Sequence, residues 1–562
     1  MGTSVKVSNL RITAGQATLV DGVDFEIEPG KVLALIGESG SGKTTTALAL
    51  MGFARHGCEI SGSIRVGTTD VLHLSPGEQR RLRGREITYI AQSAAASFNP
   101  SRTIMDQVVE PALIHRLMDR KAAEKKAVAL FRELALPDPD SIGERYPHQV
   151  SGGQLQRLMA AMALITDPDL VILDEPTTAL DVTTQVEVLR VFRRAVQERR
   201  TTAVYVSHDL AVVAQVADHI LVLREGKMRE LGETDQILYQ PADDYTRCLL
   251  AAARPTERPG APVDPDKSPL LLEVRDLSAG YGAVDAHGQP ASKILEGVGL
   301  KLYRGQAIGV IGESGSGKTT LARAIAGLVA PCCGSIAFNG RPLKPTVAER
   351  SRDELRRIQI VFQMADTALN PARTIEEILA RPLQFFHGLR GEAQRARIRQ
   401  LLDLVRLPIG VAQRTPGGLS GGQKQRVNLA RALAADPELI LCDEITSALD
   451  TVVGAAILDL MAELRKELGV SYLFISHDLH TVRSICDEIV VMQHGRKLTQ
   501  VAHQDYDRGP HHPYYALLAR SVPELRRGWI DEVDLHGESG IAVGVAGPEF
   551  HYKQPRIACP RI

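Results

Sequence analysis

The stretch Ile36–Thr45, IGESGSGKTT, occurs a second time without change at Ile311–Thr320. Each copy fits the pattern G-x-x-x-x-G-K-[ST] and follows a short apolar run, VLALI (32–36) or AIGVI (307–311), which predicts a buried strand. The glycines allow backbone N–H groups to converge on an anion, and the helix that begins in the loop adds partial positive charge. The two copies therefore predict two phosphate sites in one chain.

Every residue from the first glycine of the loop to the second threonine is expected to contact the nucleotide phosphates. Lys43 and Lys318 should reach the β- and γ-phosphates, and the hydroxyls of Thr44 and Thr319 should face Mg²⁺. The predicted ATP-binding residues are Gly37, Glu38, Ser39, Gly40, Ser41, Gly42, Lys43, Thr44 and Thr45, with Gly312, Glu313, Ser314, Gly315, Ser316, Gly317, Lys318, Thr319 and Thr320.

The loops are part of a longer internal repeat. SGGQLQR at 151–157 matches SGGQKQR at 420–426, LDEPTTALD at 173–181 matches CDEITSALD at 442–450, and SHDL occurs twice. The copies lie 275 positions apart at the loop lysines, 271 at Gln92 and Gln363, and 269 from Ser151 and Ser420 onward. This steady register predicts a duplicated domain, with residues 5–253 and 271–520 as the copies.

Between the copies lies a proline-rich stretch, residues 254–270, which predicts a short, semi-extended linker. Residues 521–562 have no internal counterpart and form a C-terminal extension of unassigned role, with the single tryptophan, Trp529, and a possible strand, GIAVGVA, at 540–546. Within each copy, β-branched apolar runs alternate with helical stretches such as 122–134. This alternation predicts an α/β fold with a mostly parallel sheet in each half.

Acidic residues follow one predicted strand of each copy. Asp174 and Asp443 should project from the carboxyl edge of the sheet and hold Mg²⁺ through water. Glu175 and Glu444 come next and are suited to polarise the attacking water as general bases. The alternative is a turn with two helix-capping acids, which the neighbouring phosphate loop disfavours.

Two further pairs complete the predicted catalytic set. His208 and His477 each lie 34 residues after the aspartate of their copy and can hydrogen-bond the γ-phosphate or the water. Gln92 and Gln363 follow predicted strands, and a neutral amide there could contact both Mg²⁺ and water. A histidine or glutamine at a strand end can also be purely structural, but the repeated spacing favours function.

The SGGQ element predicts a second anion site in each copy. Ser151 and Ser420 are expected N-caps, and the glycines after them expose N–H groups at a helix N-terminus. One copy already binds phosphate through its own loop, so the spare site is explained if it closes over the nucleotide of the other copy, with the two halves facing head to tail. The residues predicted to make this contact are Ser151, Gly152, Gly153, Gln154, Ser420, Gly421, Gly422 and Gln423.

Composition limits the partners. The 562 residues are 44% hydrophobic and 24% charged with a formal net charge of −1, which gives no bulk electrostatic reason to expect nucleic acid. The first residues contain no apolar signal-peptide core. No run of 18 apolar residues occurs, so we expect no membrane-spanning helix, and any channel would come from other subunits.

Together these motifs resemble the ABC ATPase family over residues 5–520, and more narrowly the ATP-binding subunits of oligopeptide, dipeptide and nickel importers, here as two fused nucleotide-binding domains. The narrower likeness rests on SAAASFNP (93–100) and MADTALNP (364–371), and on tyrosine-leucine extensions that contain Tyr245 and Tyr514. The resemblance implies two tandem P-loop domains, each with a helical subdomain, that use ATP and Mg²⁺ to drive solute import.

The resemblance also implies partners and a location. The segments after Gln92 and Gln363 would engage two integral membrane permease subunits, an extracytoplasmic solute-binding protein would act indirectly, and nucleic acid would not be a partner. The protein would be peripheral, on the cytoplasmic face of the inner membrane. The cargo would be a peptide, glutathione, nickel or an opine-type chelate. In the same context His511 and His512 are interpreted as docking residues rather than metal ligands.

Within the resemblance, Tyr281 would stack on adenine in the second copy, whereas no aromatic residue precedes Phe25 in the first copy. Both copies keep every catalytic residue, so both are expected to hydrolyse ATP. The alternatives are a sugar-importer ATPase, which usually has one weakened site, and a soluble double ATPase acting on ribosomes, which typically has a long charged linker. ATPases of DNA repair are disfavoured because no long insert separates Lys43 from Ser151.

Overall fold

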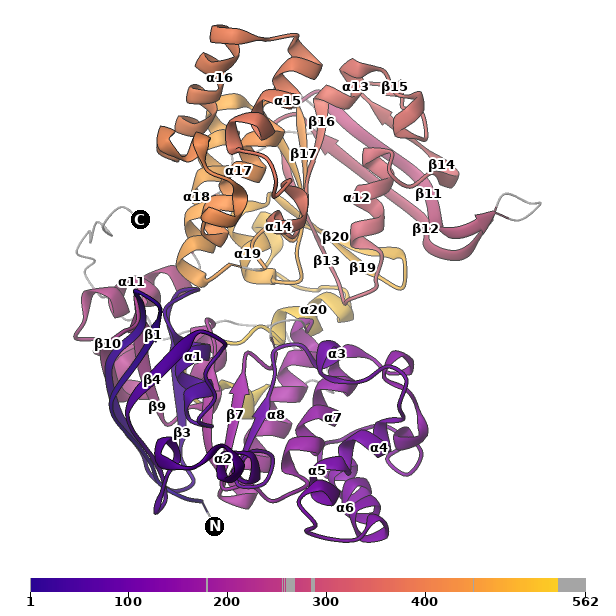
Figure 1. Cartoon of the computed structure of the whole chain (residues 1–562). Coiled ribbons are helices and arrows are strands. Elements are labelled where there is room, and N and C mark those ends of the chain that lie inside the picture. Colours follow the sequence, from indigo (N-terminus) through magenta and orange to yellow (C-terminus); the bar gives the residue numbers. More distant parts are fainter. Residues whose placement is uncertain are drawn as a thin grey trace. The chain divides into compact units, whose positions relative to one another are not determined.

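The computed structural model describes residues 2–177, 180–254, 256, 258, 268–284, 289–447 and 449–533 (Figure 1). The chain forms two compact units. The first unit comprises Met1–Arg254 together with Asp450–Val452 and Pro523–Asp534, and the second comprises Pro255–Leu449, Val453–Val522 and Leu535–Ile562. The predicted strand at 540–546 and most of the predicted linker lie outside the described residues.

The first unit has two sheets. An antiparallel sheet has the order β2-β1-β4-β5, and a six-stranded sheet has the order β10-β9-β3-β8-β7-β6, in which only β10 is antiparallel to its neighbour. The strands are β1 Val5–Ala14, β2 Ala17–Ile27, β3 Val32–Ile36, β4 Cys58–Val66, β5 Thr69–Asp70, β6 Ile87–Ile90, β7 Leu170–Asp174, β8 Thr202–Val206, β9 His219–Arg224 and β10 Lys227–Glu233.

Helices surround the six-stranded sheet and follow its strands (Figure 1). The helices of the first unit are α1 Lys43–Ala49, α2 Pro76–Leu82, α3 Ala94–Ser97, α4 Ile104–Val108, α5 Glu110–Ile114, α6 Arg120–Glu133, α7 Gly152–Leu164, α8 Val182–Arg199, α9 Leu210–Val216, α10 Thr234–Tyr239 and α11 Asp244–Ala253, with α21 Trp529–Glu532 from the C-terminal extension. Thus α1, α8 and α9 come after β3, β7 and β8, at the end of the sheet where the acids and the histidine lie.

The second unit repeats this plan, with sheet orders β12-β11-β14-β15 and β16-β17-β18-β13-β19-β20. Its strands are β11 Leu270–Val284, β12 Pro290–Tyr303, β13 Ala307–Ile311, β14 Pro331–Phe338, β15 Arg341–Pro342, β16 Ile358–Val361, β17 Leu439–Asp443, β18 Ser471–Ile475, β19 Glu488–Gln493 and β20 Arg496–Ala502. Its helices are α12 Lys318–Ala326, α13 Arg352–Arg357, α14 Ala365–Ala368, α15 Ile375–His387, α16 Gly391–Leu404, α17 Gly421–Leu433, α18 Thr451–Leu468, α19 Leu479–Ile485 and α20 Pro513–Arg520.

The expected α/β fold with a mostly parallel sheet in each half is confirmed, and each unit adds a four-stranded antiparallel sheet that was not predicted. The apolar runs predicted as strands are β3, β7 and β8 in the first unit and β13, β17 and β18 in the second, and nearly all their residues are buried. Their residues join one hydrophobic core with the antiparallel sheet and α1, or α12 in the second unit. The phosphate loop therefore leaves directly from the core, which fixes the position of its first residue.

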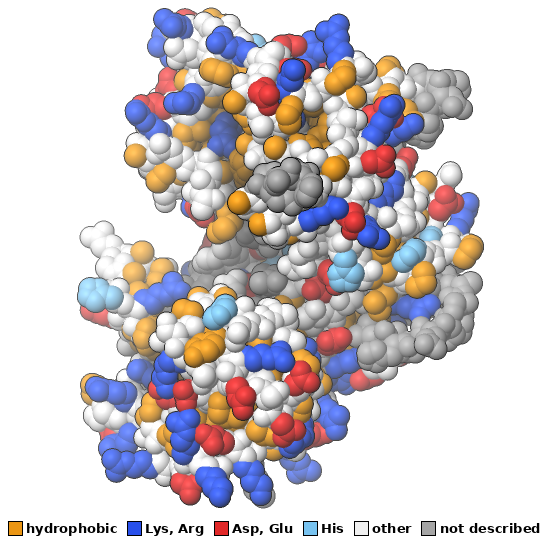
Figure 2. Space-filling view, turned by 90° about the vertical axis from the view of Figure 1, so that its right-hand side faces the viewer, with side chains coloured by type: hydrophobic (Ala, Val, Ile, Leu, Met, Phe, Trp, Pro, Cys, Tyr) orange, Lys and Arg blue, Asp and Glu red, His pale blue; other side chains and the backbone are white. Residues whose placement is uncertain are grey.

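The surface is mixed in charge. Figure 2 shows basic and acidic side chains interspersed over the visible face, as the balanced composition predicts. Within the described residues, no helix combines the length and apolar character that crossing a membrane requires.

Candidate functional site

Backbone geometry forces glycine at the start of each phosphate loop. Gly37 has φ 147°, and a Cβ atom there would lie 2.0 Å from the carbonyl oxygen of Leu223. Gly312 has φ 152°, with the carbonyl oxygen of Met492 at 2.1 Å from such an atom. No side chain fits at this distance, so the strand can turn sharply into the loop only with glycine.

The loop lysine of each unit is buried and lies inside the loop. Lys43 Nζ donates to the carbonyl oxygens of Gly37 at 2.7 Å and Glu38 at 2.8 Å. Lys318 makes the same bonds to Gly312 and Glu313, at 2.8 and 2.9 Å. Burial lowers the pKa of Lys43, while nearby carboxylates, first that of Glu175, oppose the shift. The ammonium is thus held at the centre of the loop, where a phosphate oxygen would bind.

The threonine after the lysine is joined to the aspartate at the end of the neighbouring strand. Thr44 Oγ1 donates to Asp174 Oδ1 at 3.1 Å, and Thr319 Oγ1 donates to Asp443 Oδ1 at 2.9 Å. In the first unit Tyr89 also donates its hydroxyl to Asp174 Oδ2, at 2.7 Å. Burial raises the pKa of both aspartates, and these hydrogen bonds oppose the shift.

The predicted base, amide and histidine meet in each unit. Gln92 Nε2 donates to Glu175 Oε2 at 3.0 Å, and His208 Nδ1 lies 3.2 Å from Glu175 Oε1. Both oxygens of one carboxylate are therefore engaged, one by a neutral amide and one by an imidazole.

The second unit has the same arrangement. Gln363 Nε2 donates to Glu444 Oε2 at 2.7 Å, and His477 Nδ1 lies 3.5 Å from Glu444 Oε1. Glu175 and Glu444 have φ values of 48° and 49°, in the left-handed region that non-glycine residues seldom adopt. Such local strain is characteristic of functional positions.

The histidine pKa values follow from this pairing. Burial lowers the pKa of His208 and of His477, but the hydrogen bond and charge of the paired glutamate outweigh it, so both pKa values are raised. Burial raises the pKa of Glu444, but the hydrogen bond and charge of His477 outweigh it, so this pKa is lowered. The pair in the second unit therefore favours a charged imidazole beside a charged carboxylate.

The SGGQ serines are N-caps, as predicted. Ser151 caps α7 and Ser420 caps α17, each accepting a hydrogen bond from the backbone N–H of Gln154 or Gln423. The glutamine Oε1 atoms in turn accept a hydrogen bond from the serine N–H, at 3.0 Å for Ser151 and 3.1 Å for Ser420. This completes a capping box. Each unit by itself thus shows a preformed helix N-terminus at Gly152 and Gly153 or at Gly421 and Gly422.

The predicted adenine residue lies beside the phosphate loop. Tyr281 on β11 is 39% exposed, and its hydroxyl lies 3.4 Å from Thr320 Oγ1 on α12. Phe25 in the first unit is buried in the core, so it offers no face to a base. A small depression next to Thr45 contains an exposed aromatic instead, Phe53, with Ile12 and Leu48. No motif in the sequence pointed to Phe53.

Two tyrosines of the predicted tyrosine-leucine extensions lie at the phosphate loops. The Glu38 N–H donates to the Tyr245 hydroxyl at 3.1 Å, and the Glu313 N–H donates to the Tyr514 hydroxyl at 3.0 Å. Their spacing of 269 was a visible signal, but sequence alone did not show that α11 and α20 pack back on the loop. His512, interpreted as a docking residue, accepts from the Tyr514 N–H as the N-cap of α20.

The donor set fits a nucleotide with Mg²⁺. In each unit a threonine hydroxyl bonds an aspartate, Thr44 with Asp174 or Thr319 with Asp443. The amide of Gln92 or Gln363 bonds the glutamate next to that aspartate in sequence. Oxygen donors of this kind suit Mg²⁺ better than softer metals. Ser41 and Ser316 also keep buried Oγ atoms with no hydrogen-bond partner among the described residues, inside loops that a phosphate would complete.

A strand, a glycine-rich loop with lysine, a helix and an acid pair at the neighbouring strand define a P-loop nucleotide hydrolase, present twice. The model of the family described as "ABC transporter" matches residues 20–178 and 295–447, and the one described as "Oligopeptide/dipeptide transporter, C-terminal region" matches residues 503–544. The chain belongs to the ABC transporter family and is an ATPase of that family with two nucleotide-binding domains.

The chain is similar to curated proteins over most of its length. It is 33% identical to the oligopeptide transport ATP-binding protein OppD of Mycobacterium tuberculosis, covering 94% of this chain and 100% of that protein. It is 35% identical to the glutathione import ATP-binding protein GsiA of Pectobacterium atrosepticum, covering 92% and 89%. Among solved structures, cbiO1 of Clostridium perfringens aligns with 42% of this chain and 90% of its own at 28% identity, with a TM-score of 0.37.

Proposed function

We propose that the chain is the ATP-hydrolysing motor of an importer for peptides or a related small solute. The observation that carries this proposal is the glutamate held by an amide and an imidazole beside a complete phosphate loop, found in both units. The similarity to oligopeptide and glutathione import subunits supports the direction of transport and the class of cargo.

In each site the glutamate acts as general base. Glu175 or Glu444 takes a proton from water while the water oxygen attacks the γ-phosphorus, and the bond to the ADP oxygen breaks in line. Gln92 and Gln363 orient the carboxylate and the water, and His208 and His477 hold the other carboxylate oxygen and can donate to the γ-phosphate. The lysines and loop N–H groups bind the β- and γ-phosphates.

Bound Mg²⁺ would neutralise charge on the β- and γ-phosphate oxygens. Thr44, Asp174 and Gln92 would hold it in the first unit, and Thr319, Asp443 and Gln363 in the second. Adenine would stack on Tyr281 in the second unit, and we assign the same role to Phe53 in the first because it is an exposed aromatic next to Thr45.

Each site would be completed by the capped helix of the opposite repeat. The exposed N–H groups after Ser420 would close on the nucleotide at Lys43, and those after Ser151 on the nucleotide at Lys318. ATP binding would then close the two halves and hydrolysis would reopen them, and this cycle would drive alternating access in the membrane subunits.

The partners would be two integral membrane permease subunits, contacted through the segments after Gln92 and Gln363, with an extracytoplasmic solute-binding protein acting upstream. The chain would be peripheral to the cytoplasmic face of the inner membrane. We propose no nucleic-acid partner, because charges of both signs are interspersed on the surface (Figure 2).

The experiment that tests this function is uptake of labelled oligopeptide and labelled glutathione by cells that lack the gene. Wild-type protein should restore uptake of one of them, and the Glu175→Gln, Glu444→Gln double variant at equal abundance should not. Uptake that does not depend on the gene, together with co-sedimentation with ribosomes, would contradict the importer function and favour a soluble double ATPase.

A further inference from the structure

The segment Pro523–Val533, called here the C-terminal segment, follows the second repeat in sequence but belongs to the first unit. Its anchors are Trp529 and Ile530, which are 3% and 1% exposed. A large aromatic and a branched aliphatic side chain buried together identify a docked segment rather than a loose end.

The segment is fastened to the last turn of α9 through one buried side chain. Gln215 Nε2 donates to the carbonyl oxygens of Glu524 at 2.9 Å and Arg526 at 2.8 Å. The Ile530 N–H donates to Gln215 Oε1 at 3.1 Å. Gln215 is 4% exposed and also donates to the Ala211 carbonyl oxygen of α9 at 3.1 Å, so the segment provides the further hydrogen bonds of this buried amide.

The segment is also held by α8. Arg190 donates from Nε and Nη2 to the Ile530 carbonyl oxygen, at 3.1 and 3.0 Å, and from Nη2 to that of Val533. Arg193 pairs with Asp531 at 2.9 Å. Two helices of the nucleotide domain therefore form one groove, called here the α8–α9 groove, and the segment lies in it.

In the second unit the corresponding helix positions are also contacted from outside the repeat, through different groups. Asp459 and Ser484 lie 269 residues after Arg190 and Gln215, and both bind Arg258. Arg258 Nε donates to Asp459 Oδ1 and its N–H donates to the Ser484 carbonyl oxygen, each at 2.6 Å. Arg258 itself lies 269 residues before Arg527. In both units, then, a residue from outside the repeat contacts these two helix positions.

The two grooves differ beneath the docked segment. In the second unit Arg465 is buried and donates to the carbonyl oxygen of Gly305 at 2.7 Å and to the carboxylate of Asp487. Its counterpart in the first unit is Val196, and a cavity of about 260 Å³ is present there. The cavity is lined by the counterparts of those two acceptors, Gly30 and Asp218.

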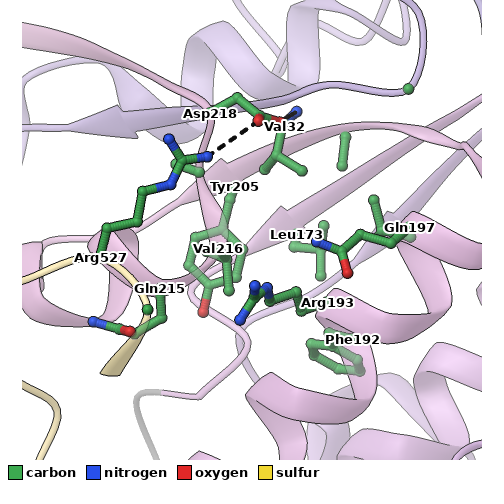
Figure 3. Close-up of a pocket in the computed structure, with 15 residues that line it drawn as sticks. Val32, Leu173, Phe192, Arg193, Gln197, Tyr205, Gln215, Val216, Asp218 and Arg527 are labelled. Atoms are coloured by element: carbon green, nitrogen blue, oxygen red, sulfur yellow. Dashed lines mark hydrogen bonds and ion pairs between the residues drawn. The ribbon is translucent and has the colours of Figure 1, made fainter. Parts of the chain in front are cut away.

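In the first unit, where Val196 replaces Arg465, the C-terminal segment places a guanidinium beside Asp218. Arg527 lies 3.5 Å from Asp218, and Figure 3 shows its side chain directed toward that carboxylate. Lys31 lies 3.4 Å from the same oxygen. Asp218 in turn accepts from the Val32 N–H at 3.0 Å, at the start of β3, the strand that leads into the phosphate loop.

We propose that the α8–α9 groove of the first unit is a docking site for the C-terminal segment of this chain, and that docking positions His208. The two ends of α9 provide the link. Asp209, next to His208, caps its start by accepting from the N–H groups of Ala211 and Val212, and Gln215 anchors its last turn to the segment. The helix is only seven residues long, so an anchor at one end constrains the other.

The positioning role rests on the function proposed for His208, and it makes Gln215 a positioning residue. The test uses Gln215→Ala in the full chain, in a Glu444→Gln background that leaves turnover to the first site. We expect kcat to fall about tenfold, as displaced catalytic groups do, while the KM for ATP stays within about twofold. The pH profile of kcat should shift, since His208 loses its fixed distance to Glu175, and hydrogen exchange at residues 207–217 should rise.

Arg194→Ala is the matched control. Arg194 lies on α8 beside Arg193, is 73% exposed at its side chain and pairs with Glu198. This control should leave kcat, the pH profile and hydrogen exchange unchanged. A folded Gln215→Ala variant with the parent kcat and pH profile would overturn the positioning role, and one with parent hydrogen exchange as well would overturn docking.

A milder variant covers the case in which Gln215→Ala does not fold. Asp531→Ala removes an ion pair whose carboxylate is 64% exposed, so the fold should persist with a smaller shift of kcat in the same direction. Parent values for kcat and hydrogen exchange in that variant and in Trp529→Ala would overturn the proposal. If the Glu444→Gln parent itself shows no turnover, the function proposed for the first site fails, and hydrogen exchange alone then decides docking.

Discussion

Gln92 donates a hydrogen bond to the carboxylate of Glu175 at 3.0 Å, across 83 residues of sequence. Gln363 and Glu444 repeat it at 2.7 Å. The amide comes from the second residue after β6 or β16, and the glutamate directly follows β7 or β17, so two adjacent parallel strands bring the pair together. The amide proposed to contact Mg²⁺ and the proposed base are thereby joined directly.

Replacing both glutamates should stop hydrolysis without preventing binding. Glu175→Gln with Glu444→Gln keeps the shape of each side chain but removes the proton acceptor. We expect turnover to fall by about 10²- to 10⁴-fold, with ATP retained at both sites, measured by phosphate release and by bound nucleotide after rapid gel filtration. Undiminished hydrolysis would contradict the assignment of the base.

The histidine–glutamate pair of the second unit predicts a pH-dependent stability. The pKa of His477 is raised, so its stabilising effect is full below its ordinary value near 6.5 and is lost as pH rises through the raised pKa. Glu444→Gln should therefore lower the free energy of unfolding of the second unit at pH 6, by about 1 kcal/mol. The difference from wild type should shrink toward pH 9 in denaturant titrations. A difference that grows with pH would contradict the pairing.

The adenine contacts predict separate effects of two aromatic residues. Tyr281→Ala should raise the KM for ATP in a Glu175→Gln background, where the second site turns over, and Phe53→Ala should do so in a Glu444→Gln background. Loss of one stacked aromatic corresponds to about 1 kcal/mol, or roughly fivefold in KM. Each substitution should leave the KM unchanged in the opposite background, and an effect of Phe53→Ala only with Glu175→Gln would contradict its assignment.

Much of the fold followed from the sequence because its strands are short, apolar and buried on both faces. The runs before both phosphate loops and before both acid pairs became β3, β13, β7 and β17. The N-caps Ser151 and Ser420 were equally predictable, because capping depends on residues within one turn.

The contacts that sequence did not predict join residues distant along the chain. Tyr89 reaches Asp174 across 85 residues, and the second unit has Ile360 at that position, so the repeat gave no signal. Tyr245 reaches the phosphate loop across 207 residues. The docking of the C-terminal segment depends on its contacts with α8 and α9, and no local pattern predicts such contacts.

The most direct test of the central claim, that each site combines the loop of one repeat with the SGGQ helix of the other, is ATP occlusion in two matched chains. In the Glu175→Gln, Glu444→Gln background, Lys43→Ala is combined either with Ser420→Arg or with Ser151→Arg, and ATP per chain is counted after rapid gel filtration. If the sites are reciprocal, the chain with Ser420→Arg has both substitutions in the same site, so its other site should retain one ATP. The chain with Ser151→Arg has one substitution in each site and should retain none. The opposite result, with none for Ser420 and one for Ser151, would show that each repeat closes its own site and would contradict the account.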